Sequence, residues 1–118
     1  MLEAVDHIDF KVPDLERAVA WFAGLGLVER RRIPERGSVE MALPGEGQVV
    51  FELREDPSLD GFVMDHIAFR STTQTADAAA VGEATGATFT RVDTFIPVTG
   101  KTISDFTDPH GGRWQLSD

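Results

Sequence analysis

The sequence contains no cysteine, which excludes both disulfide bonds and thiolate metal ligands. It has no run of eighteen apolar residues, the length that a membrane-spanning helix needs, and its first residues lack the basic and apolar regions of a signal peptide. Basic residues are scarce, because 11 Lys and Arg stand against 20 Asp and Glu, for a net charge of −9. Such a charge disfavours nucleic acid and anionic membranes as partners. We therefore expect a cytoplasmic protein that binds neither, with any metal site built from His, Asp, Glu, Gln or Asn.

The sequence does contain an internal repeat. Residues 6–11 (Asp-His-Ile-Asp-Phe-Lys) return as residues 65–70 (Asp-His-Ile-Ala-Phe-Arg), 59 positions later (66 − 7 = 59), which is half of the 118-residue chain. Both copies alternate apolar and polar residues with period two, the pattern of a half-buried strand. Ile8 and Phe10 should face a core, and His7 should face the other way. In the second copy we expect three residues to face away from the core: His66, Ala68 and Arg70.

Each copy of the repeat opens the same order of predicted elements. After the first strand, Leu15, Ala18, Val19 and Phe22 have the spacing of an amphipathic helix, which begins after Asp14. Strands are then predicted at 27–33, 38–43 and 48–54. The second half predicts a strand at 63–70, a helix at 74–85 and strands at 87–96, 101–107 and 113–117. The second helix has a thin apolar face of small residues: Ala76, Ala79, Ala80 and Ala84.

The closing strands of the two halves also match. Residues 51–53 (Phe-Glu-Leu) and 114–116 (Trp-Gln-Leu) each place an aromatic residue, a polar group and a leucine in the same order. Two such units, about 1–54 and 62–118, cannot each bury a sheet face alone and should share one core in a single domain. The sequence therefore predicts an α+β fold of two pseudo-symmetric strand–helix–three-strand modules.

This duplicated unit, with a His in each opening strand and an Asp-Pro-x-Gly turn at 108–111, resembles the vicinal oxygen chelate superfamily. That superfamily includes glyoxalases, methylmalonyl-CoA epimerases, extradiol dioxygenases and bleomycin-resistance proteins. The resemblance covers essentially the whole chain. It implies a cupped, barrel-like mixed sheet with the helices on its outside, and a homodimer. Because the fold serves many activities, it does not choose among them.

The resemblance also implies a metal site. Superfamily ligands come from the first and last strand of each module, which here carry His7, Glu52, His66 and Gln115. Strand alternation places the same four side chains on the non-core face. Two imidazoles, one carboxylate and one amide suit a divalent ion such as nickel, cobalt, zinc, manganese or iron. The alternative is four polar side chains on the wet face of a sheet, and their matched positions in both repeats favour the metal.

Gln115 departs from the superfamily pattern, since metal-binding members usually carry Glu in the last strand. A glutamine cannot take a proton at neutral pH. Epimerases of the superfamily often read His, Gln, His, Glu along the chain, and this sequence reads His, Glu, His, Gln, which is the same set with the modules exchanged. Glu52 is therefore the predicted catalytic base. Together with His7 and His66 it also makes the two-His–one-carboxylate set of a non-haem iron oxygenase.

Cations on the non-core face could bind an anionic substrate. Four residues are candidates: Lys11, Arg54, Arg70 and Arg113. Alternatively, these side chains cap strand ends in solvent.

Three functions are open at this point. The first is a metal-dependent lyase, isomerase or epimerase that acts on a small oxygenated substrate through a metal-stabilised enolate. The second is an iron dioxygenase, although such relatives are mostly longer chains. The third is a non-catalytic protein that binds an antibiotic or metabolite, as bleomycin-resistance proteins do. Such members typically lack the ligand set, so the retained set favours the first.

Overall fold

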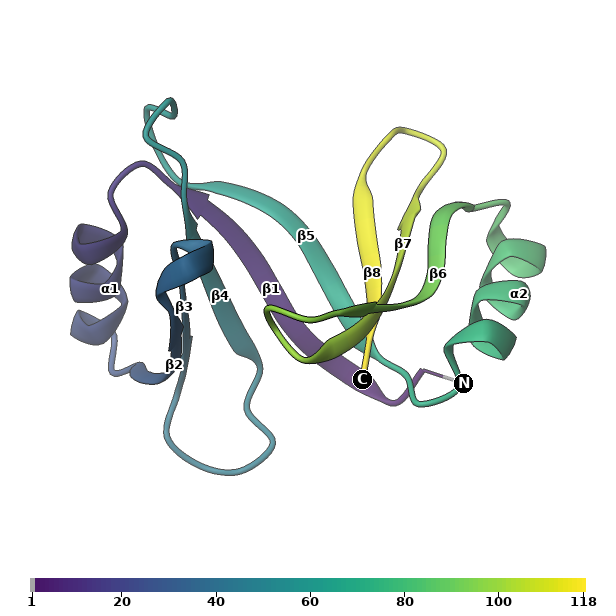
Figure 1. Cartoon of the computed structure of the whole chain (residues 1–118), viewed down its shortest axis with the longest axis horizontal. Helices are drawn as coiled ribbons and strands as arrows, with labels where there is room; N and C mark the ends of the chain where they lie inside the picture. The colour runs from purple at the N-terminus through teal and green to yellow at the C-terminus, as the bar shows by residue number, and fades with distance from the viewer. Residues whose placement is uncertain (1) are drawn as a thin grey trace. The chain divides into compact units, whose positions relative to one another are not determined.

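The computed structural model describes residues 2–118, which form eight β-strands, two α-helices and a short 3₁₀ helix (Figure 1). The chain divides into two compact units. One unit is His7–Asp65, and the other joins the residues before His7 to His66–Asp118. The predicted α+β class, with two strand–helix–three-strand modules and a mixed sheet, is confirmed.

The unit His7–Asp65 contains one helix and strands in the order β2-β3-β4-β1. Its elements are the larger part of β1 (Ala4–Val12), then α1 (Leu15–Gly24), β2 (Val28–Ile33), η1 (Pro34–Arg36), β3 (Ser38–Ala42) and β4 (Val50–Glu55). Strand β1 runs parallel to β4, and the β2–β3 and β3–β4 pairs are antiparallel.

The second unit repeats this topology with strands in the order β5-β8-β7-β6. Its elements are β5 (Val63–Arg70), α2 (Gln74–Thr85), β6 (Thr88–Ile96), β7 (Lys101–Thr107) and β8 (Arg113–Ser117). Strand β5 runs parallel to β8, and β7 is antiparallel to both of its neighbours, as in the first unit. The repeat predicted from the sequence is therefore a repeat of topology as well.

Helix α1 forms where its apolar spacing predicts. The Asp14 side chain accepts a hydrogen bond from the backbone N–H of Arg17 at 3.1 Å, which caps the first turn. Gly26, with a φ of 99°, turns the chain after the helix. The helix buries Leu15 and Phe22 in a core shared with β1, β3 and β4. Full burial of one such side chain contributes about 1.5–3 kcal/mol.

Helix α2 has the predicted bounds but buries a different face. The four alanines expected to form its apolar face are exposed: Ala76, Ala79, Ala80 and Ala84. The buried residues are Gln74, Asp77 and Ala78. Gln74 donates to the carbonyl of Thr102 at 2.7 Å, and Asp77 accepts from Ser71 at 2.6 Å. Hydrogen bonds thus orient this helix, because alanine side chains offer little area for a hydrophobic driving force.

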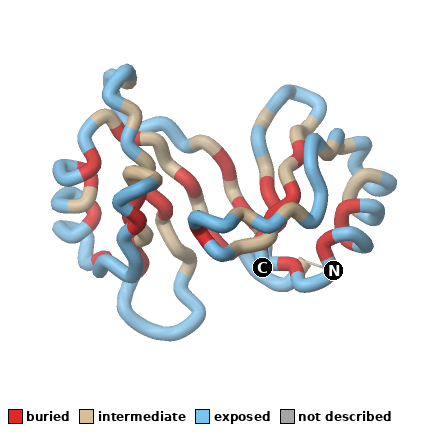
Figure 2. The backbone as a smooth tube through the Cα atoms, viewed as in Figure 1, coloured by how far each residue is buried: buried red, intermediate tan, exposed pale blue. Residues whose placement is uncertain are grey.

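The polar sides of β1 and β5 are buried rather than wet. Buried positions alternate with less buried ones along β1 (Figure 2). His7 is 4% exposed and Asp9 is fully buried, whereas Ile8 and Phe10 are only half-buried. Ala68, which we expected to face outward, has no exposed surface. Charged groups tolerate this burial because they are paired within the protein. The predicted core side is confirmed, since Phe10 and Phe69 pack against the hydrophobic cores of their units, but the side expected to be wet is buried as well.

Among residues 2–118, no helix is long and apolar enough to cross a membrane.

Candidate metal centre

In the first unit, two of the predicted ligands come together. His7 lies on β1 and Glu52 on the parallel strand β4, whose register pairs Asp9 with Glu52. Both side chains are buried, at 4% and 7% exposure. His7 Nε2 lies 3.7 Å from Glu52 Oε2. An imidazole nitrogen and a carboxylate oxygen from adjacent strands therefore lie close together on the same face of the sheet.

Glu52 also has a cationic neighbour that the sequence analysis missed. Its second oxygen, Oε1, lies 2.5 Å from Arg36 Nη1. Arg36 ends the 3₁₀ helix, and Gly37, with a φ of 65°, leads from it into β3. This segment reads as a plain turn in the sequence, so no periodic signal marks Arg36. The two oxygens of Glu52 thus have separate neighbours, the guanidinium on one side and His7 on the other.

The second unit presents the other two predicted ligands in the same register. His66 lies on β5 and Gln115 on β8, and each is 7% exposed. The parallel pairing of β5 with β8 aligns Ala68 with Gln115, so the histidine lies two residues before the position opposite the last-strand ligand. The same holds for His7 and Glu52 in the first unit. Each module therefore supplies an imidazole and an oxygen donor from equivalent places.

Gln115 is held by its neighbour on β7. Its Nε2 donates to Asp105 Oδ1 at 2.8 Å, and Asp105 Oδ2 is paired with Arg91 on β6. The first unit has a corresponding set of residues across its strands. Glu40 on β3 is paired in register with Glu52 on β4, and Glu40 lies 4.0 Å from Arg31 on β2. Neither set of contacts is visible in the sequence, because the partners are adjacent only across strands.

The predicted substrate-binding cations are engaged in ion pairs. Arg54 holds Asp9 with two hydrogen bonds, Nε to Oδ2 at 2.9 Å and Nη2 to Oδ1 at 2.8 Å, and lies 3.4 Å from Asp65. Burial disfavours the charged guanidinium, but the hydrogen bonds to Asp9 and the charges of Asp9, Glu52 and Asp65 outweigh it and raise the pKa of Arg54. Lys11 lies 3.3 Å from Asp65. These charges are therefore largely balanced inside the first unit.

A similar cluster forms in the second unit around Asp6. Arg70 lies 3.4 Å and Lys101 3.1 Å from its two oxygens. Arg113, at the start of β8, is exposed. A role for Arg70 and Arg113 in substrate binding stays a prediction, and Asp6 would compete with an anion for Arg70.

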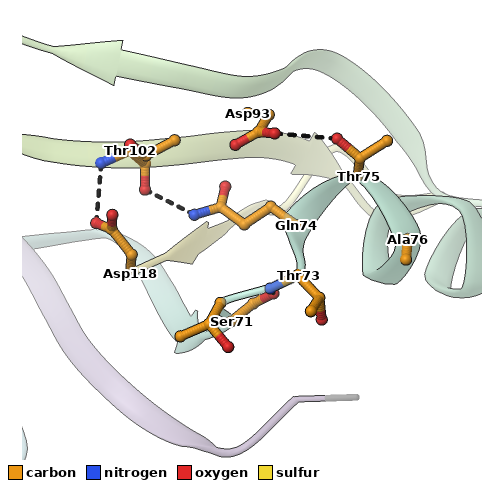
Figure 3. A pocket seen from close by; sticks show the side chains of 9 residues that line it. Ser71, Thr73, Gln74, Thr75, Ala76, Asp93, Thr102 and Asp118 are labelled. Carbon is orange, nitrogen blue, oxygen red and sulfur yellow. Dashed lines mark hydrogen bonds between the residues drawn. The ribbon is translucent and has the colours of Figure 1, made fainter.

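A cavity of about 340 Å³ opens at the start of α2, and its lining is rich in hydroxyl and carboxylate groups (Figure 3). Its side chains bond one another and nearby backbone, as Thr75 does with Asp93 at 3.1 Å and Asp118 with the N–H of Thr102 at 2.9 Å. None of the predicted metal ligands lines it.

The donors present fit a divalent metal. Two ligands at about 2.1 Å from one ion with tetrahedral or octahedral angles are roughly 3.0–3.4 Å apart, and the His7–Glu52 separation of 3.7 Å is close to that range. Buried imidazole, carboxylate and amide groups also match the chemistry of a borderline metal such as zinc, nickel, cobalt or iron.

Duplicated modules with a matched histidine and oxygen donor in each define a protein of the vicinal oxygen chelate class. The family model described as Glyoxalase/Bleomycin resistance protein/Dioxygenase superfamily matches residues 4–116. The chain belongs to this superfamily. A comparison with curated proteins finds no match.

Solved structures of the same fold include both epimerases and a dioxygenase. A variant of methylmalonyl-CoA epimerase from Streptomyces coelicolor, in complex with 2-nitronate-propionyl-CoA, has a TM-score of 0.72 and 22% identity, over 99% of this chain and 97% of that one. The methylmalonyl-CoA epimerase from Mycobacterium tuberculosis has a TM-score of 0.68 and 20% identity, over 98% of this chain and 87% of that one. BphC, a halotolerant catechol dioxygenase, has a TM-score of 0.66 and 20% identity, over 99% of this chain but 39% of that one. At these identities the likeness shows the fold.

Proposed function

We propose that the protein is a metal-dependent enzyme of the glyoxalase or epimerase type, which acts on a small oxygenated, anionic substrate. The observation that carries this proposal is the equivalent placement of a buried histidine and an oxygen donor in both modules, with His7 and Glu52 3.7 Å apart. A purely structural role would not require imidazoles at the same register position in both halves. Membership of the superfamily supports the same reading.

The metal would be held by His7, Glu52, His66 and Gln115. Bound there, it would act as a Lewis acid that stabilises the enolate of a substrate chelated through adjacent oxygens. Glu52 is the carboxylate among the four, so it is the group that takes and returns the proton at the carbon next to the carbonyl. Oε2, on the side of His7, is the oxygen that would be available to the metal, because Oε1 is paired with Arg36.

An iron dioxygenase is the second candidate. His7, His66 and Glu52 supply the two imidazoles and one carboxylate that such enzymes use. The fold likeness to a catechol dioxygenase supports this reading, although the present chain spans 39% of that protein. A non-catalytic protein that binds an antibiotic or metabolite would be the remaining function, and it would need no metal.

Solvent-deuterium exchange tests the proposed chemistry. Methylmalonyl-CoA is a suitable first substrate, because a structural relative is described in complex with it. In deuterated water we expect the wild-type protein to exchange the proton at C2 in a metal-dependent manner, and Glu52→Gln to lower the rate by about 100-fold or more. Gln115→Ala should lower it less, since the amide carries no proton in the reaction.

Metal analysis of the purified protein separates the candidates. Nickel, cobalt, zinc or manganese with deuterium exchange supports the enolate route, and iron with oxygen consumption on catechols supports the dioxygenase. If Glu52→Gln retains its metal and exchanges protons at the wild-type rate, Glu52 is not the base.

A further inference from the structure

Each module places an acidic residue directly opposite its last-strand ligand. The β3–β4 register pairs Glu40 with Glu52, and the β7–β8 register pairs Asp105 with Gln115. Residues paired in this way lie on the same face of the sheet, with Cβ atoms about 4.5–5.5 Å apart. Both modules therefore have an acidic residue at this position. It faces a glutamate in the first module and a glutamine in the second.

The first module balances two adjacent carboxylates with two arginines. Arg36 lies 2.5 Å from Glu52, and Arg31 lies 4.0 Å from Glu40. Each carboxylate thus has its own cation, so the like charges of Glu40 and Glu52 can stand side by side.

The second module uses its acid differently. Arg91 pairs with Asp105 through Oδ2, and Oδ1 accepts the hydrogen bond from Gln115 Nε2 at 2.8 Å. A carboxylate that is paired with a guanidinium can only accept hydrogen bonds. The atom that faces Asp105 must therefore be the amide nitrogen of Gln115, and the amide oxygen is the end that points away from it.

We propose that Asp105 is a positioning residue that makes glutamine the required residue at position 115 and presents its Oε1 to the metal. A carboxylate at that position would lie at hydrogen-bond distance from Asp105 with no proton between them. This inference rests on the proposed function for the role of Oε1. The choice of glutamine itself rests only on the contact between Asp105 and Gln115, and it can be tested without metal.

Reversing the hydrogen bond tests the choice of glutamine. We compare the metal-free melting temperatures of Gln115→Glu, Asp105→Asn and the double variant. Gln115→Glu should lower the melting temperature by about 5 °C, because two carboxylates then face each other. The double variant should recover most of this loss, since the amide introduced at 105 can donate to the carboxylate introduced at 115. If the changes in melting temperature of the two single variants simply add in the double variant, the inference is overturned.

Glu40→Gln provides the matched control. It removes the same charge from the equivalent position of the first module, so its combination with Gln115→Glu should show no recovery. Recovery of equal size in this control would mean that the general reduction in negative charge stabilises the protein, and would also contradict the role of Asp105.

Titration with Co²⁺, followed by calorimetry, tests the metal part. In Asp105→Asn the amide of Gln115 can turn its nitrogen toward the site, so we expect Co²⁺ affinity to fall about 10-fold or more. Equal affinity in wild type and Asp105→Asn would overturn the orienting role. If wild type itself binds no Co²⁺, the proposed metal centre fails, whereas recovery in the double variant would still support the choice of glutamine.

Discussion

At the scale of single residues, Glu52 has the most consequential surroundings. It is buried between a histidine that the proposed metal site uses and an arginine that the site does not. Arg36 neutralises the carboxylate in the metal-free protein, which reduces the cost of burying it. A positive guanidinium close to a divalent ion should also repel it. The proposed metal would therefore compete with Arg36 for Glu52.

Replacing Arg36 tests this competition. In Arg36→Gln we expect Co²⁺ affinity to rise roughly 10-fold, because a repelling charge is removed and Oε1 of Glu52 is released. Arg31→Gln is the control, since Arg31 pairs with Glu40 and not with Glu52. Calorimetric titration of both variants measures the effect. A fall in affinity in Arg36→Gln would instead show that Arg36 orients Glu52.

At the scale of elements, the turn between β7 and β8 depends on Asp108. Its carboxylate accepts hydrogen bonds from Trp114 Nε1 at 2.9 Å, from the N–H of Gly112 at 3.0 Å and from the N–H of His110 at 2.8 Å. These bonds, that from Trp114 first, lower the pKa of Asp108 below its usual range. The carboxylate thus fixes the start of the strand that carries Gln115.

This lowered pKa predicts a pH-dependent effect of Asp108→Asn. A carboxyl group whose pKa is lower in the folded than in the unfolded protein stabilises the fold above its unfolded pKa of about 3.9, and this stability is lost as the pH falls through its folded pKa. We expect Asp108→Asn to lower the free energy of unfolding at pH 7, by an amount that shrinks as the pH falls below about 3.9. Urea unfolding followed by tryptophan fluorescence measures both.

His110→Ala is the control for this turn, because His110 is exposed and contributes its backbone N–H to Asp108. It should match wild type at pH 7. A difference between Asp108→Asn and wild type that stays constant down to pH 3 would refute the assignment to the carboxylate.

At the scale of the whole molecule, the repeat explains what sequence analysis could predict. The bounds of β5, α2, β7 and β8 agree with the structure because turn residues mark their ends. The prediction of which face of α2 is buried was wrong. Gln74 and Asp77 are buried and form hydrogen bonds with residues outside the helix, and no periodicity in the sequence reveals these partners. The ligand candidates followed from repeat symmetry, whereas Arg36 and Asp105 depend on cross-strand contacts.

A homodimer remains a prediction at this scale, and one apolar surface is a candidate for its interface. Trp21 and Leu25 are each 56% exposed and Phe62 is 44% exposed, with the rings of Trp21 and Phe62 6.0 Å apart. Exposed apolar clusters of this kind mark interaction sites. We expect light scattering to give a dimer, and Trp21→Ser to weaken it. Phe95→Ser, at a residue 59% exposed in the other unit, is the control. A wild-type monomer would contradict the prediction.

Metal stoichiometry most directly tests the proposal that His7, Glu52, His66 and Gln115 would hold one metal ion. We would load Co²⁺ onto wild type, His7→Ala and His66→Ala, and measure bound metal per chain after desalting. We expect one equivalent in wild type and near-complete loss in each variant, because each would remove a ligand of the same ion. Two equivalents in wild type, or full retention of metal in either variant, would show that the modules do not share a metal centre.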